Sequence, residues 1–212
     1  MTDILNTIYE SVLEGNSKQV SESVQQAVDA GVDVGDILNK GLIIAMTEVG
    51  RRFEDGEYYV PEMLIAARAM SAGMEIIKPL LVGAGVEPIG KIAIGTVKGD
   101  LHDIGKNLVG MMLEGAGFEI MDLGVDVTPE KFVDAIKDGA DIVAMSALLT
   151  TTMASMEATI TAIQEANLRD SVKILVGGAP VTDAYAEQIG ADGYASDASA
   201  AARKAQEIVG KS

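Results

Sequence analysis

The segment Asp100-Leu101-His102-Asp103-Ile104-Gly105 contains the only histidine among 212 residues. It follows an apolar, strand-like run, Lys91 to Val97, and precedes a helical pattern. Ligands of open α/β sheets bind at the carboxyl ends of the strands, and imidazole is the commonest protein ligand for metals. Asp100 is expected to accept a hydrogen bond from one ring nitrogen of His102, which makes the other nitrogen a stronger donor to a metal. The segment therefore indicates a candidate ligand site.

Two later strand ends are also unusual. Ser146-Ala147-Leu148-Leu149-Thr150-Thr151-Thr152 offers hydroxyl groups that could line a polar slot or orient Asp100, and Gly177-Gly178 removes side chains where a bulky ligand could approach the backbone. The helix start near Ile104 would favour a phosphate at the same edge. Each signal alone is also typical of ordinary structure, because a histidine beside an aspartate is often structural, Gly-Gly often forms a tight turn, and threonines after a strand often cap a helix.

The elements that position these residues change in kind along the chain. Roughly the first eighty residues carry apolar side chains at helical spacing and predict four helices: one through Ile4 and Val12, then Ser17–Ala30, Val34–Phe53, and one from Pro61 onward. Four helices with short connections predict a small bundle. The stretch from Val82 to Gly90 contains three glycines and a proline and is predicted to be a linker.

Beyond this linker, apolar runs of strand length alternate with helical segments. Five strands are expected, at Lys91–Val97, Phe118–Leu123, Asp141–Ser146, Val172–Val176 and Gly193–Ala195. Such alternation predicts right-handed crossovers and a doubly wound parallel sheet, of Rossmann or flavodoxin type, with helices on both faces. The predicted fold class is therefore α followed by α/β, with a helical domain over residues 1–88 and a five-stranded domain over residues 89–212.

Composition narrows the possible functions. The chain has no cysteine, which excludes disulfides, iron–sulfur clusters and a cysteine nucleophile, and one histidine excludes a multi-histidine zinc site. The net charge of −16 makes nucleic-acid binding unfavourable, because an acidic surface repels phosphate backbones. The sequence shows no bilayer-spanning apolar run and no secretory leader, so we expect no membrane association and a cytoplasmic location.

Taken together, the three strand-end blocks resemble a known signature. Asp100-x-His102-x-x-Gly105, followed after 40 residues by Ser146-x-Leu148 and after a further 28 by Gly177-Gly178, is similar to the cobalamin-binding motif of methionine synthase, certain mutases and the corrinoid methyl carriers. The helical half, including the run from Tyr59 to Met70, resembles the helical cap of the methyl-transferring members, which the mutases lack. The chain looks most similar to the small corrinoid proteins of methylamine, methanol and methoxyl-compound methyltransferase systems.

This resemblance implies a role for each matching residue. His102 would be the lower axial ligand of cobalt in place of the cofactor's own benzimidazole. Asp100 would bond His102 and relay its protonation state to Thr152, which stands where the family commonly has a serine. The cofactor-binding residues would be Asp100, His102, Asp103, Ile104, Gly105, Ser146, Leu148, Thr150, Thr152, Gly177 and Gly178. Tyr59, Met63 and Met70 would cover the upper face of cobalt, although methionines at helical spacing are also typical of a core.

By the same resemblance, the cofactor would be cobalamin or a related corrinoid that alternates between cob(I)alamin and methylcobalamin. The protein would be a methyl carrier without catalytic residues of its own. Its partners would be a substrate-specific methyltransferase, a second methyltransferase that acts on a thiol or tetrahydrofolate-type acceptor, and a reductive activase. The glycine-rich linker would let the cap move aside when a partner docks.

Two alternatives remain at this point. A cobalamin-dependent sensor or regulator would share the cap and the cobalamin domain, but the sequence shows no basic helix-turn-helix segment for DNA binding. An unrelated doubly wound domain with a structural histidine is the other alternative. A dinucleotide-binding domain would need G-x-G-x-x-G after the first strand, where Lys98-Gly99-Asp100-Leu101 stands instead.

Overall fold

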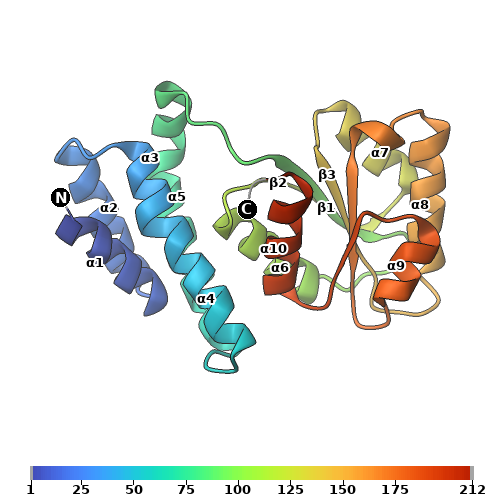
Figure 1. Ribbon diagram of the computed structural model, residues 1–212, viewed down its shortest axis with the longest axis horizontal. Helices are drawn as coiled ribbons and strands as arrows, with labels where there is room; N and C mark the ends of the chain where they lie inside the picture. The colour runs from blue at the N-terminus through green and yellow to red at the C-terminus, as the bar shows by residue number, and fades with distance from the viewer. Residues whose placement is uncertain (1, 211–212) are drawn as a thin grey trace. The chain divides into compact units, whose positions relative to one another are not determined.

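A computed structural model describes residues 2–210 of the chain, which form two compact units (Figure 1). One unit extends up to Glu87 and the other begins at Pro88, one residue before the predicted start of the second domain. Within the described residues, no helix combines the length and the apolar character needed to cross a bilayer.

The N-terminal unit is helical, as predicted. Its elements are α1 (Thr2–Leu13), α2 (Ser17–Asp29), a continuous stretch made of α3 (Val34–Asp36), the π-helical turn η1 (Ile37–Ile43) and α4 (Ile44–Glu54), and finally α5 (Val60–Ala84). Apolar side chains at helical spacing point inward, and the fully buried ones include Ile8, Val24, Leu42, Val49 and Ile77. A Cβ at Gly73 would lie 2.9 Å from Val20 Cγ1, so the absence of a side chain there lets α5 pack closely on α2. Four helical segments around one core confirm the predicted bundle.

The predicted linker begins too early. We expected it to start at Val82, but α5 continues through Gly83 to Ala84. A glycine inside a helix costs only about 1 kcal/mol, and the helical spacing of the buried Ile77 and Leu81 outweighs that cost. The helix ends at Gly85, whose φ of +68° is left-handed, and the Val86 amide then donates to the Leu81 carbonyl at 3.1 Å. This is a glycine-terminated helix end of the Schellman type.

The C-terminal unit contains five parallel strands in the order β2-β1-β3-β4-β5. They are β1 (Lys91–Val97), β2 (Glu119–Val127), β3 (Ile142–Ser146), β4 (Lys173–Gly177) and β5 (Gly193–Ala195). The intervening helices are α6 (Ile104–Gly115), α7 (Pro129–Lys137), α8 (Ala154–Glu165), α9 (Asp183–Ile189) and α10 (Ala198–Ile208). Figure 1 shows α6 and α10 on one face of the sheet and α7, α8 and α9 on the other, which confirms the doubly wound prediction.

Strand β2 extends beyond its predicted end at Leu123. Its pairing register with β1 shifts between Ile94 and Gly95 and again between Gly95 and Val97. The β2 residues opposite these shifts include Gly124, with φ +85°, and Asp126, with φ +51°. Both residue types are common in turns, so the sequence pattern suggested that the strand had ended. The shifts are β-bulge-like irregularities, which let the strand continue past two left-handed residues.

The strand order places a topological switch point beside β1. The chain leaves β1 toward β2 on one side and then returns past β1 to β3 on the other. Loops that leave a sheet in opposite directions open a crevice between their strand ends, where ligands of this fold class bind. The loop that contains His102 follows β1, and the loop from Ala147 to Thr152 follows β3.

Candidate functional site

The sheet brings the three predicted loops to one edge. Thr96 near the end of β1 is paired in register with Ser146, and Ser146 is paired with Gly177 of β4. The carboxyl ends of β1, β3 and β4 are therefore level, and the residues that follow them share the same edge of the sheet.

The centre of this edge is a pair formed by Asp100 and His102. The imidazole Nδ1 lies 2.6 Å from Asp100 Oδ1, and the Asp100 side chain is completely buried whereas that of His102 is 51% exposed. An ionised carboxylate only accepts hydrogen bonds, so Nδ1 carries the proton of this contact, and in the neutral ring Nε2 then keeps its lone pair. Nε2 has no hydrogen-bond partner among residues 2–210. The pair therefore presents one oriented nitrogen donor to the outside of the sheet.

The loop after β3 holds the Asp100 carboxylate. Asp100 Oδ2 accepts hydrogen bonds from the Leu148 amide at 2.8 Å and from the Thr152 hydroxyl at 2.7 Å, and Oδ1 also accepts from the His102 amide at 3.1 Å. Burial by itself raises the pKa of Asp100, but the hydrogen bonds from the His102 ring, the Leu148 amide and the Thr152 hydroxyl outweigh it and hold this pKa well below the usual range. Asp100 therefore remains an anion that orients His102. The structure brings together Asp100, His102, Leu148 and Thr152, all named from the sequence.

Two hydroxyl groups that the sequence reasoning missed also hold the loop. Thr96, which is fully buried at the end of β1, donates to the His102 carbonyl at 2.8 Å. Ser155, at the start of α8, donates to the Lys98 carbonyl at 3.0 Å. Thr96 could have been noticed as the only hydroxyl inside an otherwise apolar strand, whereas no local pattern marks Ser155.

Exposed apolar side chains surround this pair. Ile104 is 83% exposed and Leu101 is 70% exposed, and Leu148 and Leu149 are also exposed. Leu101, Leu148 and Leu149 belong to the two loops that meet at Asp100, and Ile104 is the first residue of α6. Leu101 and Leu149 were not predicted as site residues. Large apolar side chains gathered around an imidazole indicate a binding surface for a ligand with an extensive apolar face. Beside them Gly105 has open space where a Cβ would be, and Asp103 is the exposed N-cap residue of α6.

The glycines after β4 have a structural cause as well as a predicted ligand role. A Cβ on Gly178, whose φ is +128°, would lie 1.9 Å from the Ala147 carbonyl oxygen, and one on Gly177 would lie 3.0 Å from that of Ala195. Both glycines therefore let neighbouring loops pack closely. Ser146 is half-buried and Thr150 is exposed at the same edge, and their role in holding a ligand remains a prediction.

The three residues predicted to cover the upper face of cobalt differ in exposure, and that role stays a prediction. Met63 and Met70 are buried. Their helical spacing reflects a core stripe, the alternative that this spacing always allowed. Tyr59, at the turn before α5, is 66% exposed and remains a prediction.

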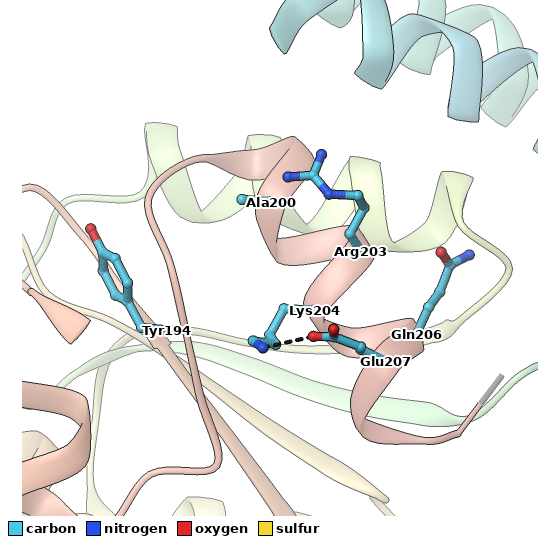
Figure 2. Close-up of a pocket in the computed structure, with 6 residues that line it drawn as sticks. All are labelled: Tyr194, Ala200, Arg203, Lys204, Gln206 and Glu207. Carbon is cyan, nitrogen blue, oxygen red and sulfur yellow. Dashed lines mark hydrogen bonds and ion pairs between the residues drawn. The ribbon is translucent and has the colours of Figure 1, made fainter. Parts of the chain in front are cut away.

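A separate pocket of about 440 Å³ lies over α10 and β5 (Figure 2). It is lined by Tyr194, Ala200, Arg203, Lys204, Gln206 and Glu207. The Lys204 ammonium pairs with Glu207 at 2.6 Å, and Figure 2 shows the Arg203 side chain extending away from that pair. None of the predicted site residues lines this pocket, so it is distinct from the edge that carries His102.

The donor set at the edge fits one kind of metal centre. Within the described part of the chain, no group of three or more histidine, aspartate or glutamate side chains could hold a metal ion. His102 nevertheless offers a single, well-oriented nitrogen amid apolar side chains. A single protein donor suits a metal whose remaining ligands belong to a macrocycle.

Comparisons with known proteins agree with this geometry. Residues 90–203 match the family model of a B12 binding domain, and residues 4–78 match a second B12 binding domain model. The chain is 42% identical to a corrinoid protein of Desulfitobacterium hafniense and 41% identical to the dimethylamine corrinoid protein of Methanosarcina barkeri, each match covering 98% of both chains. In the solved methanol:cobalamin methyltransferase complex of Methanosarcina barkeri, one chain superposes with a TM-score of 0.88 at 29% identity, covering 99% of this chain and 81% of that one.

Proposed function

The chain belongs to the corrinoid proteins built from B12-binding domains, and from this premise we propose that it carries a methyl group on the cobalt of a bound corrinoid between two methyltransferases. When bound, the corrinoid supplies a cobalt centre that accepts and releases the methyl group. The observation that carries the proposal is the Asp100–His102 pair, which presents Nε2 from the β1–β3 switch point.

His102 is proposed as the lower ligand of cobalt, with Asp100 fixing its tautomer. Thr152 extends this pair inward. Its single hydroxyl proton has two acceptors in reach, Asp100 Oδ2 at 2.7 Å and the Leu149 carbonyl at 2.9 Å. If Asp100 gains a proton, it can donate to Thr152 Oγ1 while Thr152 donates to Leu149, so every group stays hydrogen-bonded. The cluster can therefore accept one proton without leaving a buried group unpaired, which supports Thr152 as the end of the relay despite its departure from serine.

The remaining edge residues are proposed to hold the rest of the cofactor. The exposed side chains of Leu101, Ile104 and Leu149 supply apolar contacts for the ring. Ser146, Leu148, Thr150, Gly177 and Gly178 are proposed to line the slot for the nucleotide tail. Asp103 and Gly105 stand at the start of α6, where the absence of a side chain at Gly105 leaves room for the cofactor to approach.

The helical unit is proposed to be a cap domain, residues 1–88, that precedes a cobalamin domain of residues 89–212. Tyr59 is its proposed contact with the upper face of cobalt. The segment after α5, from Gly85 to Gly90, is proposed to let the cap move when a partner docks. This role would be refuted if a cross-link between cap and sheet domain left methyl transfer unchanged.

The proposed partners are a substrate-specific methyltransferase, a second methyltransferase for a thiol or tetrahydrofolate-type acceptor, and a reductive activase, all in the cytoplasm. The similar chain in the methanol:cobalamin methyltransferase complex supports the first of these. The full-length similarity to corrinoid proteins does not favour the alternative of a sensor or regulator.

Reconstitution of the apoprotein with aquocobalamin tests the proposal. We expect the wild type to bind the cofactor with a visible spectrum typical of imidazole coordination, and His102→Ala to lose that spectrum. Lys173→Ala is the matched control, because Lys173 is exposed at the opposite end of the sheet. No binding by the wild type would refute the proposed function, and identical spectra for wild type and His102→Ala would refute axial ligation by His102.

A further inference from the structure

Asp126, at the end of β2, adopts a conformation that is rare for its residue type. Its φ is +51°, and Asn167 is the other non-glycine residue with positive φ in residues 2–210. Left-handed backbone is unfavourable for side chains with a Cβ, although aspartate and asparagine tolerate it better than most. Asp126 lies within the second shift of the β1–β2 register, between the paired residues Gly124 and Val127. A side-chain-bearing residue in a left-handed conformation is normally held there by compensating contacts.

For Asp126 these contacts are with the loop that carries His102. Asp126 Oδ1 accepts a hydrogen bond from the Gly99 amide at 2.7 Å, and the Asp126 amide donates to the Asp100 carbonyl at 3.0 Å. Asp126 therefore binds the loop twice, once through its side chain and once through its backbone. The bonds reach Gly99 and Asp100, just upstream of His102, although Asp126 is 27 residues from Gly99 in the sequence.

Asp100 is consequently held from both strands that flank β1. On the β3 side, the Leu148 amide and the Thr152 hydroxyl bind its carboxylate. On the β2 side, Asp126 binds its carbonyl and the neighbouring Gly99 amide. The position of a short carboxylate side chain depends on its backbone, so a shift at Gly99 and Asp100 would change the 2.6 Å contact between Asp100 and the imidazole.

We propose that Asp126 is a positioning residue for the corrinoid site, which fixes the backbone of Gly99 and Asp100 so that Asp100 holds His102 in its ligating orientation. This inference rests on the proposed function. The bulge and the left-handed residue at the end of β2 are then explained as the means by which an edge strand reaches the loop after β1.

Three substitutions separate the contributions of Asp126. Asp126→Gly keeps the left-handed backbone without a steric penalty but removes the acceptor for the Gly99 amide. Asp126→Asn keeps both the tolerated backbone and an acceptor oxygen. Asp126→Ala loses both the acceptor oxygen and the tolerance of the left-handed backbone. Asn167→Gly is the matched control, because Asn167 has the same left-handed backbone (φ +59°) after α8, where its amide donates to the Gln164 carbonyl and not to the His102 loop.

The experiment loads each full-length variant with aquocobalamin and measures the dissociation constant and the fraction of bound cofactor that shows the His102-coordinated spectrum. We expect Asp126→Gly to weaken binding by about threefold to tenfold, the effect of one net hydrogen bond, and to lower the coordinated fraction. Asp126→Asn should restore both values toward wild type, Asp126→Ala should be at least as impaired as Asp126→Gly, and Asn167→Gly should leave both unchanged.

The outcomes distinguish this inference from the proposed function. If the wild type shows no His102 coordination, the proposed function fails and the inference fails with it. If the wild type shows coordination and Asp126→Gly matches it, only the inference is overturned. It is also overturned if Asp126→Asn is as impaired as Asp126→Gly, or if Asn167→Gly has the same effect, because the acceptor at this position would then not be the cause.

Discussion

Removal of the Thr152 hydroxyl tests the buried cluster around Asp100. Thr152 is 7% exposed, and its hydroxyl donates to Asp100 Oδ2 at 2.7 Å. Thr152→Val keeps the branched shape and removes only this donor, while the Leu148 amide remains 2.8 Å from the same oxygen. A hydrogen bond to a charged group contributes about 1.5–3 kcal/mol. Because the Leu148 and Leu149 amides still donate to this oxygen, we expect the apoprotein to lose about 2 kcal/mol of unfolding free energy at pH 7.

The assay is urea unfolding followed by circular dichroism, with Thr152→Ser as the matched control. Serine keeps the hydroxyl and loses one methyl group, which costs about 1 kcal/mol, so the expected order of stability is wild type, then Thr152→Ser, then Thr152→Val. The hydrogen bonds depress the folded-state pKa of Asp100, so their contribution is complete above the unfolded value of about 4 and falls as the pH drops below it. The difference in unfolding free energy between Thr152→Ser and Thr152→Val should therefore become smaller in acid. Equal stability of both variants at pH 7 would refute the proposed hydrogen bond.

Two further predictions concern other parts of the chain. Gly178→Ala should lower the unfolding free energy by about 3 kcal/mol or more in a thermal or urea titration, because its Cβ would lie 1.9 Å from the Ala147 carbonyl oxygen. Gly110→Ala is the control and should not lower the unfolding free energy in this way, because a Cβ at Gly110 would meet open space. Hydrogen bonds from Arg51 and Arg52 lower the pKa of Glu48 to about 2, so this carboxylate stabilises the fold above its usual pKa of 4.5 and the effect is lost as the pH falls through 2. Glu48→Gln should therefore lower the unfolding free energy by up to about 1 kcal/mol at neutral pH, because these ion pairs are partly exposed. An equal decrease in unfolding free energy at pH 2 would contradict a stabilising role of the Glu48 carboxylate.

The sequence predicted the elements where local pattern and tertiary environment agree. β1 begins at Lys91 and ends at Val97 as expected, because an apolar run between polar or glycine residues suits a strand buried on both faces. The sequence pattern did not predict the end of β2 or the start of the linker. Gly124 and Asp126 are turn-type residues that a β-bulge accommodates, and Gly83 lies inside a helix that packing stabilises. In each case a contact distant in sequence overrode the local propensity.

The same distinction applies to the site. Asp100, His102 and Thr152 were identified because strand ends converge in a parallel sheet, so their proximity follows from the fold class. Ser155 holds the loop through one hydrogen bond and Asp126 through two, all to backbone groups of the loop, and such contacts leave no periodicity in the sequence. Met63 is buried, and helical spacing by itself does not distinguish a core methionine from one that covers a ligand.

The arrangement around β1 suggests why the single histidine lies on a loop and is still well oriented. Thr96 binds its carbonyl, Ser155 binds the Lys98 carbonyl, Asp126 binds Gly99 and Asp100, and the β3 loop binds the Asp100 carboxylate. A loop held at this many points is ordered when the protein folds rather than when the cofactor binds, so less conformational entropy is lost on binding. The exposed imidazole and its apolar neighbours are therefore proposed to bind the cofactor without rearrangement of the loop. The anchors of the loop, and not only its proposed ligand residue, belong to this proposed binding site.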